Sequence, residues 1–258
     1  YDRVLPLVIE AFRDNPKNEK IIEGLALINA KLFNFSDAVK YYQLLFKINP
    51  KRSAGRMTFL VGLNYVSGIT QEYYLSECLK HSEILEKNLV NEALKKPNKN
   101  EIIKVGFLSS DFKKHYVSFF LENLFLNFDK KKIEVFAIST LDVVKHDTMT
   151  ATIQNIADHW YDVSDKSDIE IVSLIKSLNI NILIDLNGLT AGNKINVIKN
   201  RSAPIQISRL GYHNSTGIKN IDYLIADKNL IKKDEEILYS EKILFLPKIW
   251  NSLSKPKD

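Results

Sequence analysis

The stretch KVGFLSSDFKKHYVSFFLENLF, residues 104–125, contains the transition that decides the fold. Its apolar run VGFL stops abruptly at Ser109, Ser110 and Asp111, and an apolar pattern typical of a helix begins after His115. A short buried strand, a polar loop and a helix in this order form the repeating unit of a parallel sheet covered by helices. The stretch therefore predicts an α/β domain.

Four more short apolar runs follow, and helical patterns separate the first three runs of the series. Strands that are buried on both faces and alternate with helices favour a doubly wound, mostly parallel sheet. We predict this sheet within residues 101–250. The expected strands are IIKVGFLS (102–109), KIEVFAIS (132–139), NILIDL (181–186), PIQISRL (204–210) and DYLIAD (222–227).

Residues 1–95 have a helical pattern instead, with an internal repeat. FRDNP at 12–16 recurs as FKINP at 46–50, an offset of 34 residues that is the tetratricopeptide period. Between them, small Ala26 and Ala38 are expected where two helices approach, with Tyr42 as the bulky partner. We predict tetratricopeptide-like helical repeats here, and a polar linker at KKPNKN (95–100). A helical hairpin that matches the offset by coincidence stays open as an alternative.

The amino-acid composition and charge limit the classes of function that fit this chain. The 258 residues are 45% hydrophobic and 26% charged, which is typical of a globular protein in water. Thirty of the 36 basic residues behind the net charge of +5 are Lys, spread along the chain. Because Arg clusters with interleaved aromatics are missing, a solvated surface is favoured over a nucleic-acid partner. The single Cys78 fits a reducing cytosol, and no run approaches the roughly 20 apolar residues of a membrane span. We expect a cytoplasmic protein.

Three polar loops follow predicted strands, where an open α/β sheet binds its ligands. They are SSDFKKH (109–115), NGLTAGN (187–193) and GYHNSTG (211–217), and they offer neutral donors and acceptors that suit a sugar or a phosphate. The alternative is ordinary turn and helix-cap chemistry. The five histidines show no ligand spacing and no Asp-x-Asp pair occurs, so we predict no metal.

His115 and Asp111 are the two candidates for chemistry in the first loop. An imidazole can serve as base or donor at neutral pH, although a lone histidine at a helix start is also a common capping residue. We expect Asp111 to accept backbone N–H bonds from the loop that follows it, which would make it a poor base. Asp111 is then the organiser of the loop, and His115 contacts the reactants.

Several of these segments resemble one known family, the O-linked N-acetylglucosamine transferase/SPINDLY family. The resemblance extends over nearly the whole chain, in order. It rests on LNYVSGITQEYYLSECLKH (63–81), VGFLSSDFKKH (105–115), ILIDLNGLTAGN (182–193), APIQISRLGY (203–212), TGIKNIDYLIADKNL (216–230) and YSEKILFLP (239–247).

The resemblance implies a fold and a reaction. In that family tetratricopeptide repeats precede a two-lobed GT-B glycosyltransferase. It transfers a sugar from a UDP-sugar to Ser or Thr hydroxyls of proteins, with inversion and without metal or another cofactor. We therefore expect UDP-N-acetylglucosamine as donor and protein or peptide acceptors bound through the repeats.

The resemblance also implies site residues. His115 matches a histidine that lines the active site near the transferred sugar. Substrate-binding positions are expected at Ser109, Ser110, Asn187, Gly188, Thr190, Gly211, Tyr212, Thr216 and Gly217. Three departures from the family pattern bear on the sugar and the acceptor: Arg209 replaces a usual Trp, His213-Asn214 a Pro-Gly pair, and Asn181 a His or Asp that relatives often carry. Leu189 also stands where the family loop has an aromatic residue.

The nucleotide-binding second lobe of that family is expected after LFLPKIWN, whereas the sequence ends at Asp258. It also begins with Tyr1, so we expect a piece of a longer enzyme that is incomplete alone. Two other functions stay open. One is a catalytically inactive tetratricopeptide-type interaction module, and the other is a different ligand-binding protein with a doubly wound sheet.

Overall fold

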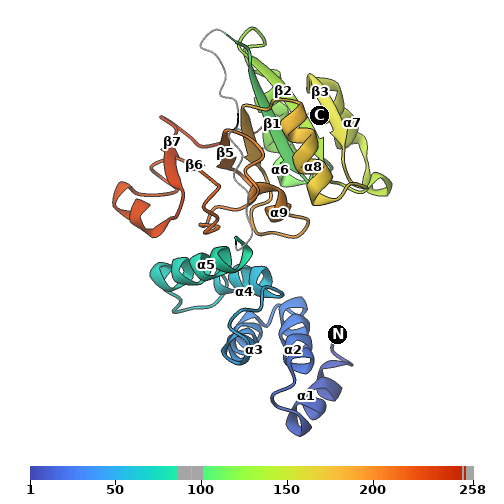
Figure 1. The fold of residues 1–258 in the computed structure, drawn as a ribbon, viewed down its shortest axis with the longest axis vertical. Coiled ribbons are helices and arrows are strands. Elements are labelled where there is room, and N and C mark those ends of the chain that lie inside the picture. Colours follow the sequence, from blue (N-terminus) through green and yellow to red (C-terminus); the bar gives the residue numbers. More distant parts are fainter. Residues whose placement is uncertain (87–93, 95–100, 252, 254–258) are drawn as a thin grey trace. The chain divides into compact units, whose positions relative to one another are not determined.

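The structure is a computed structural model that describes residues 1–86, 94, 101–251 and 253. The chain divides into two compact units, residues 1–87 and 88–258, which are coloured blue to cyan and green to red in Figure 1. The predicted linker at 95–100 lies outside the described residues. In the described part of the chain, no helix combines the length and the apolar character needed to cross a membrane.

The first unit is helical, and local signals set its helix ends. Pro6 lies in the first turn of the first helix, where a missing N–H costs nothing. Asn18 and Thr70 cap two later helices by accepting backbone N–H bonds with their side chains. The helices are α1 (Leu5–Asp14), α2 (Glu19–Lys31), α3 (Phe35–Ile48), α4 (Arg56–Leu63) and α5 (Gln71–Leu85).

The 34-residue offset recurs as a structural repeat. Asn15 and Asn49 end α1 and α3 with similar backbone angles, φ −134° and ψ 68° against φ −130° and ψ 83°. The N–H of each donates to the carbonyl four residues earlier, Ala11 at 3.0 Å and Leu45 at 2.9 Å. Equivalent positions of the two sequence motifs therefore have equivalent conformations.

The predicted close approach of two helices occurs between α2 and α3. Ala26 and Ala38 are both buried, and so is Tyr42. The Tyr42 ring stacks on Phe46 and meets Phe59 edge-on, with centroids 5.9 and 6.2 Å away. Burial raises the pKa of the Tyr42 phenol to about 12. Small residues between the helices thus make room for an aromatic cluster.

The second unit is built on a parallel sheet. Its described residues form seven strands in the order β3-β2-β1-β4-β5-β6-β7, and each neighbouring pair is parallel. The strands are β1 (Ile103–Ser109), β2 (Ile133–Ser139), β3 (His159–Asp162), β4 (Ile182–Asp185), β5 (Ile205–Ser208), β6 (Tyr223–Ala226) and β7 (Lys242–Phe245).

Helices cover both faces of this sheet (Figure 1). They are α6 (Tyr116–Leu126), α7 (Thr148–Ile156), α8 (Asp168–Ser177) and α9 (Ile195–Ile198), with short 3-10 turns η1 (Val143–Lys145) and η2 (Lys233–Leu238). The predicted fold class is confirmed, and all five predicted strands exist. Sequence reasoning missed the two edge strands. β3 is half-buried and carries polar residues at both ends, whereas β7 was missed despite the apolar signal of Ile243, Leu244 and Phe245.

The main core lies between the sheet and α6 with α7. Val105 and Phe107 of β1 face Leu121 and Phe125 of α6, and the rings of Phe107 and Phe125 are 4.7 Å apart. The alternate residues of β1 point to the other face of the sheet, where Gly106 lies against the side chain of Ile180. This double burial explains why the strand reads as an uninterrupted apolar run.

Candidate functional site

The strand order reverses between β1 and β4, which are neighbours in the middle of the sheet. The chain winds from β1 to β2 and β3 on one side, and from β4 to β7 on the other. Such a switch point is the usual ligand site of an open α/β sheet, because the loops at the carboxyl ends separate there. The loops 109–115 and 187–193 leave these two strands at that edge.

Asn187 joins the two loops. Its Oδ1 accepts the backbone N–H of Ser110 at 3.0 Å, and its Nδ2 donates to Ser110 Oγ at 3.0 Å and to Asp111 Oδ2 at 2.8 Å. The Asn187 residue is 2% exposed. We call Ser110, Asp111, His115 and Asn187 the switch-point cluster. The structure thus brings four predicted site residues from two distant segments together.

His115 is the N-cap of α6 as well as a member of this cluster. Its Nδ1 accepts the backbone N–H of Val117 at 3.4 Å and lies 3.9 Å from Asp111 Oδ2. A neutral imidazole that accepts at Nδ1 carries its proton on Nε2. The His115 side chain is 40% exposed. The capping alternative is therefore real, and it leaves Nε2–H as a hydrogen-bond donor.

Asp111 is held differently from the expectation. Among the described residues its carboxylate accepts from the Asn187 side chain, and not from the backbone of its own loop. The loop bonds go instead to the Asp111 main chain: its carbonyl accepts from Lys113 N–H and Ser118 Oγ, and its N–H donates to the buried Ser109 Oγ at 3.0 Å. Ser109 therefore supports the turn from within.

Asp185 fills the organising role that was expected of Asp111. It ends β4, is 2% exposed, and accepts the backbone N–H groups of Asn187 at 3.1 Å and Gly188 at 2.9 Å. Burial raises the pKa of Asp185 to about 6, and the two hydrogen bonds oppose that rise. Sequence reasoning missed this residue, although an Asp two residues before Asn-Gly is a signal for a side-chain-capped turn.

A second missed carboxylate anchors the first loop from outside. Asp147 caps α7, and its Oδ2 also accepts the N–H of Lys114 at 2.8 Å. Burial favours a higher pKa for Asp147, but the hydrogen bonds from Lys114, Thr150 and Met149 outweigh burial and hold this pKa below its ordinary value. Thr150 Oγ1 donates to the Phe112 carbonyl at 2.6 Å. The capping pattern was visible in the sequence, whereas its contact with the loop was not.

At two positions in the second loop, only glycine fits without strain. Gly188 and Gly192 have φ of 56° and 80°, values that side chains disfavour. A Cβ on Gly188 would collide with Tyr212, and one on Gly192 would collide with the Ser110 side chain. The loop therefore approaches its neighbours through bare backbone. Thr190 closes it, since its Oγ1 donates to the Asn187 carbonyl at 2.7 Å.

The third loop, 211–217, turns its hydroxyls inward. Thr216 donates through its N–H at 2.8 Å and its Oγ1 at 2.5 Å to Glu241 Oε1, and Ser215 Oγ donates to Glu241 Oε2 at 2.7 Å. Ser240 Oγ donates to the same carboxylate at 2.9 Å. All four residues belong to one buried or half-buried group, which we call the Glu241 cluster. No local signal in the sequence pointed to Glu241.

Of the remaining predicted positions of this loop, Gly211 and Tyr212 lie near the second loop, and Gly217 lies against the Glu241 cluster. Tyr212 is 9% exposed and packs where a Cβ on Gly188 would go, and Gly211 lies against the Leu186 carbonyl. Gly217 has φ 76° and donates its N–H to Ser215 Oγ at 3.3 Å. The structure thus places Gly211 and Tyr212 beside the site, and Thr216 and Gly217 in the Glu241 cluster. Their role in substrate binding stays a prediction.

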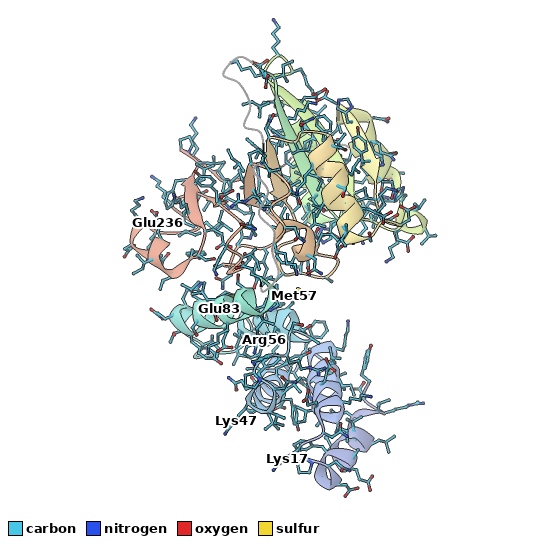
Figure 2. All side chains as sticks on the ribbon, viewed as in Figure 1. Lys17, Lys47, Arg56, Met57, Glu83 and Glu236 are labelled. Atoms are coloured by element: carbon cyan, nitrogen blue, oxygen red, sulfur yellow. The ribbon has the colours of Figure 1, made fainter. Side chains whose placement is uncertain are left out.

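The helical unit has a groove of about 630 Å³ between α3, α4 and α5. Arg56 forms its floor: it is 4% exposed, lies 4.2 Å from the centroid of the Phe46 ring, and has Glu77 at 3.8 Å. Exposed charges line the rim, among them Lys47 and Glu83, which Figure 2 labels together with Arg56. The groove therefore combines an aromatic wall with both signs of charge.

Comparisons with known proteins agree on one family. Residues 57–252 match the profile of glycosyl transferase family 41. A protein of Arabidopsis thaliana named "Probable UDP-N-acetylglucosamine--peptide N-acetylglucosaminyltransferase SEC" is 34% identical over 145 residues, 56% of this chain and 15% of its own length. The SPINDLY protein of Oryza sativa subsp. japonica, which carries the same enzyme name, is 29% identical over 216 residues, 81% of this chain and 23% of its own length.

A solved structure shares the fold. An O-GlcNAc transferase mutant of Thermobaculum terrenum superposes with a TM-score of 0.72 at 19% identity, and covers 98% of this chain and 55% of the other. The chain spans about a sixth to a quarter of the length of the two curated relatives. The family match extends over more than half of its residues. On this ground the chain belongs to glycosyl transferase family 41.

Proposed function

We propose that this chain is the helical unit and N-terminal lobe of a GT-B protein O-glycosyltransferase. It would transfer N-acetylglucosamine from UDP-N-acetylglucosamine to Ser or Thr hydroxyls of proteins. Family membership supports glycosyl transfer, and the printed names of the relatives support this donor and a peptide acceptor. Within the structure, the observation that carries the proposal is the switch-point cluster, which holds an imidazole at the ligand-binding edge of the sheet.

The reaction that we propose is a single displacement with inversion. The acceptor oxygen forms a bond to the anomeric carbon while the sugar–phosphate bond breaks, the electron pair of that bond goes to the diphosphate, and the hydroxyl proton passes to solvent water. Preorganised hydrogen-bond donors stabilise the negative charge that develops on the leaving phosphate oxygen. His115 is suited to this because its Nδ1 is occupied by Val117 N–H, which leaves Nε2–H to donate. The neutral polar groups of the two loops would orient the sugar, and the scheme needs neither a metal nor another cofactor.

Asp111 and Asn187 act through His115 in this scheme. Asn187 fixes the carboxylate of Asp111 at 2.8 Å, and that carboxylate faces His115 Nδ1 at 3.9 Å. The pair thereby fixes the loop that carries His115, without contacting the reactants. We propose Ser110, Gly188 and Thr190 as the nearest sugar-binding positions, because they border the same two loops.

The uridine diphosphate would bind mainly to a second lobe outside these 258 residues. The curated relatives are several times longer than the part that the chain matches. We therefore expect the 258-residue chain alone to bind UDP weakly and to turn over no UDP-sugar. Isothermal titration calorimetry tests this: a micromolar dissociation constant for UDP would contradict the division of labour between two lobes.

The decisive test is His115→Ala in an enzyme that contains both lobes. A positioned donor or acid–base group contributes about 10²–10⁴-fold in rate, so turnover should fall by that factor while stability changes little. The matched control is His159→Ala, because His159 is equally exposed but pairs with Glu134 at 2.7 Å on edge strand β3. Turnover of the His115 variant within a few-fold of wild type would leave His115 as a cap only.

A second candidate function is an interaction module without catalysis. The groove of the helical unit favours it, since aromatic and charged side chains line a space large enough for part of a peptide. Two results together would favour this candidate over the transferase. Peptide binding would depend on Arg56, and His115→Ala would have no effect on the activity of the intact protein.

A further inference from the structure

Arg209 is a buried cation at the ligand-binding edge of the sheet. It follows β5 directly, its N–H donates to the Asp185 carbonyl at 3.0 Å, and the residue is 8% exposed. Its Nη2 donates to the carbonyl of Trp250 at 3.3 Å. Its Nε is buried and has no hydrogen-bond partner within the described part of the chain.

Other arginines with limited exposure lie near carboxylates. Arg52 contacts Glu19 and Glu23, Arg56 has Glu77 at 3.8 Å, and Arg201 contacts Asp222 at 2.6 Å. No ion pair formed among residues 1–86 and 101–251 includes Arg209. A buried charge without a counter-charge is strongly destabilising, so its presence requires an explanation.

A second polar atom lacks a partner beside the same tryptophan. The ring of His213 meets the ring of Trp250 edge-on with centroids 4.1 Å apart, and His213 Nε2 is buried without a hydrogen bond to any described residue. Burial lowers the pKa of both Arg209 and His213. No residue that the structure describes therefore supplies either group with an anion, and two unpartnered groups in one neighbourhood point to an absent ligand.

We infer that Arg209 and His213 form an anion subsite at the carboxyl end of β5, which binds a phosphoryl or carboxylate group of a ligand. The planar guanidinium fork matches either group in bidentate geometry. Because β5 adjoins β4, and paired strands lie about 5 Å apart, the bound anion lies beside the switch-point cluster. The inference concerns binding, and it goes beyond the proposed transfer because it stands whether or not His115 assists catalysis.

The first test observes the Nε–H group of Arg209 directly. The ¹⁵N-labelled chain of 258 residues has six arginines, whose Nε–H resonances are recorded during titration with inorganic pyrophosphate or with acetate at constant ionic strength. The Arg209 resonance is assigned by its loss in Arg209→Lys. We expect it to shift in a saturable way with one anion, while the resonance of carboxylate-paired Arg201 stays. Saturation by pyrophosphate assigns a phosphoryl group, and saturation by acetate alone assigns a carboxylate.

The second test compares stability with binding. Arg209→Met keeps an unbranched apolar stem in place of the aliphatic part of the side chain but removes the guanidinium charge, and Arg201→Met is the matched control. Without added anion, we expect Arg209→Met to have a melting temperature no lower than that of wild type. With anion, the variant should need at least a tenfold higher anion concentration for the same rise in melting temperature. Arg201→Met should lower the melting temperature and keep the anion response.

Three results would overturn the subsite. They are the absence of a saturable shift with either anion, equal shifts of Arg201 and Arg209, and an anion response that survives in both Arg209→Met and Arg209→Lys. Should Arg209→Met fail to fold, the Lys variant and the resonance of the wild-type Arg209 decide the question, because neither depends on the Met variant.

Discussion

The switch-point cluster and the Glu241 cluster are built from similar residues with opposite results. Both follow strands of the same sheet, and both combine small hydroxyl or amide side chains with a carboxylate. In the first, the side chains of His115 and Asp111 stay 40% and 15% exposed. In the second, Ser215 and Thr216 are fully buried against a Glu241 that is 3% exposed. The Glu241 cluster is thus closed to a ligand by its burial, whereas the switch-point cluster keeps polar side chains exposed.

Removing the carboxylate of the buried cluster should have the largest effect on stability. Glu241→Ala leaves the Ser215 and Thr216 hydroxyls and the Thr216 N–H without an acceptor, which should cost about 3–5 kcal/mol of unfolding free energy. Urea denaturation measures this. Glu236→Ala is the control, because Glu236 on η2 pairs with the 84% exposed Lys233 and should cost less than about 1 kcal/mol. Similar losses in both variants would abolish the contrast between the clusters.

The contribution of Asp185, which caps the turn of Asn187, to the unfolding free energy should depend on pH. The pKa of Asp185 is about 6 in the folded protein against an ordinary value of 3.8, so the folded state binds this proton more tightly than the unfolded state. Its stabilising contribution is complete below pH 3.8 and is lost as the pH rises towards and through 6. The expected loss is on the order of 3 kcal/mol for a shift of this size.

Asp185→Asn isolates that effect, since Asn stays neutral and the other carboxylates cancel in the comparison. The unfolding free energy of wild type should fall relative to the variant by about 2 kcal/mol between pH 4 and pH 7, most of the full effect. Denaturation curves at each pH give this difference. A difference that does not depend on pH would mean that Asp185 is ionised at its usual pH despite its burial.

The smallest expected effect on stability belongs to Asp111. Asp111→Asn keeps an acceptor for Asn187 Nδ2, so the unfolding free energy should change by less than about 1 kcal/mol. In the complete enzyme its turnover should fall moderately, and less than that of His115→Ala. The pH–rate profile sharpens the assignment. Loss of the acidic limb in the Asp111 variant, with its retention in His115→Ala, would reverse the two roles.

Much of the fold followed from local patterns. Apolar runs such as Val105–Leu108 are buried on both faces and therefore need helices on both sides, which settles the α/β class. The offset between Asn15 and Asn49 likewise predicted a helical repeat, and the structure gives the two positions equivalent helix ends. Strand β3 escaped prediction because a half-exposed strand tolerates polar residues and loses the apolar signal, whereas β7 was missed although three of its four residues are apolar.

For the candidate site, the sequence by itself determined which loops leave the strands and which residues they carry, among them Ser110, His115 and Asn187. Only the tertiary structure decided what those residues do. The bond between Ser110 and Asn187 joins positions 77 residues apart, and the bond between Thr216 and Glu241 joins positions 25 residues apart. Local patterns carry no record of such partners, because a hydroxyl turns towards whichever acceptor the packed sheet brings within 3 Å of it. The same is true of Arg209, whose lack of a carboxylate partner among the described residues is a property of its surroundings in the fold.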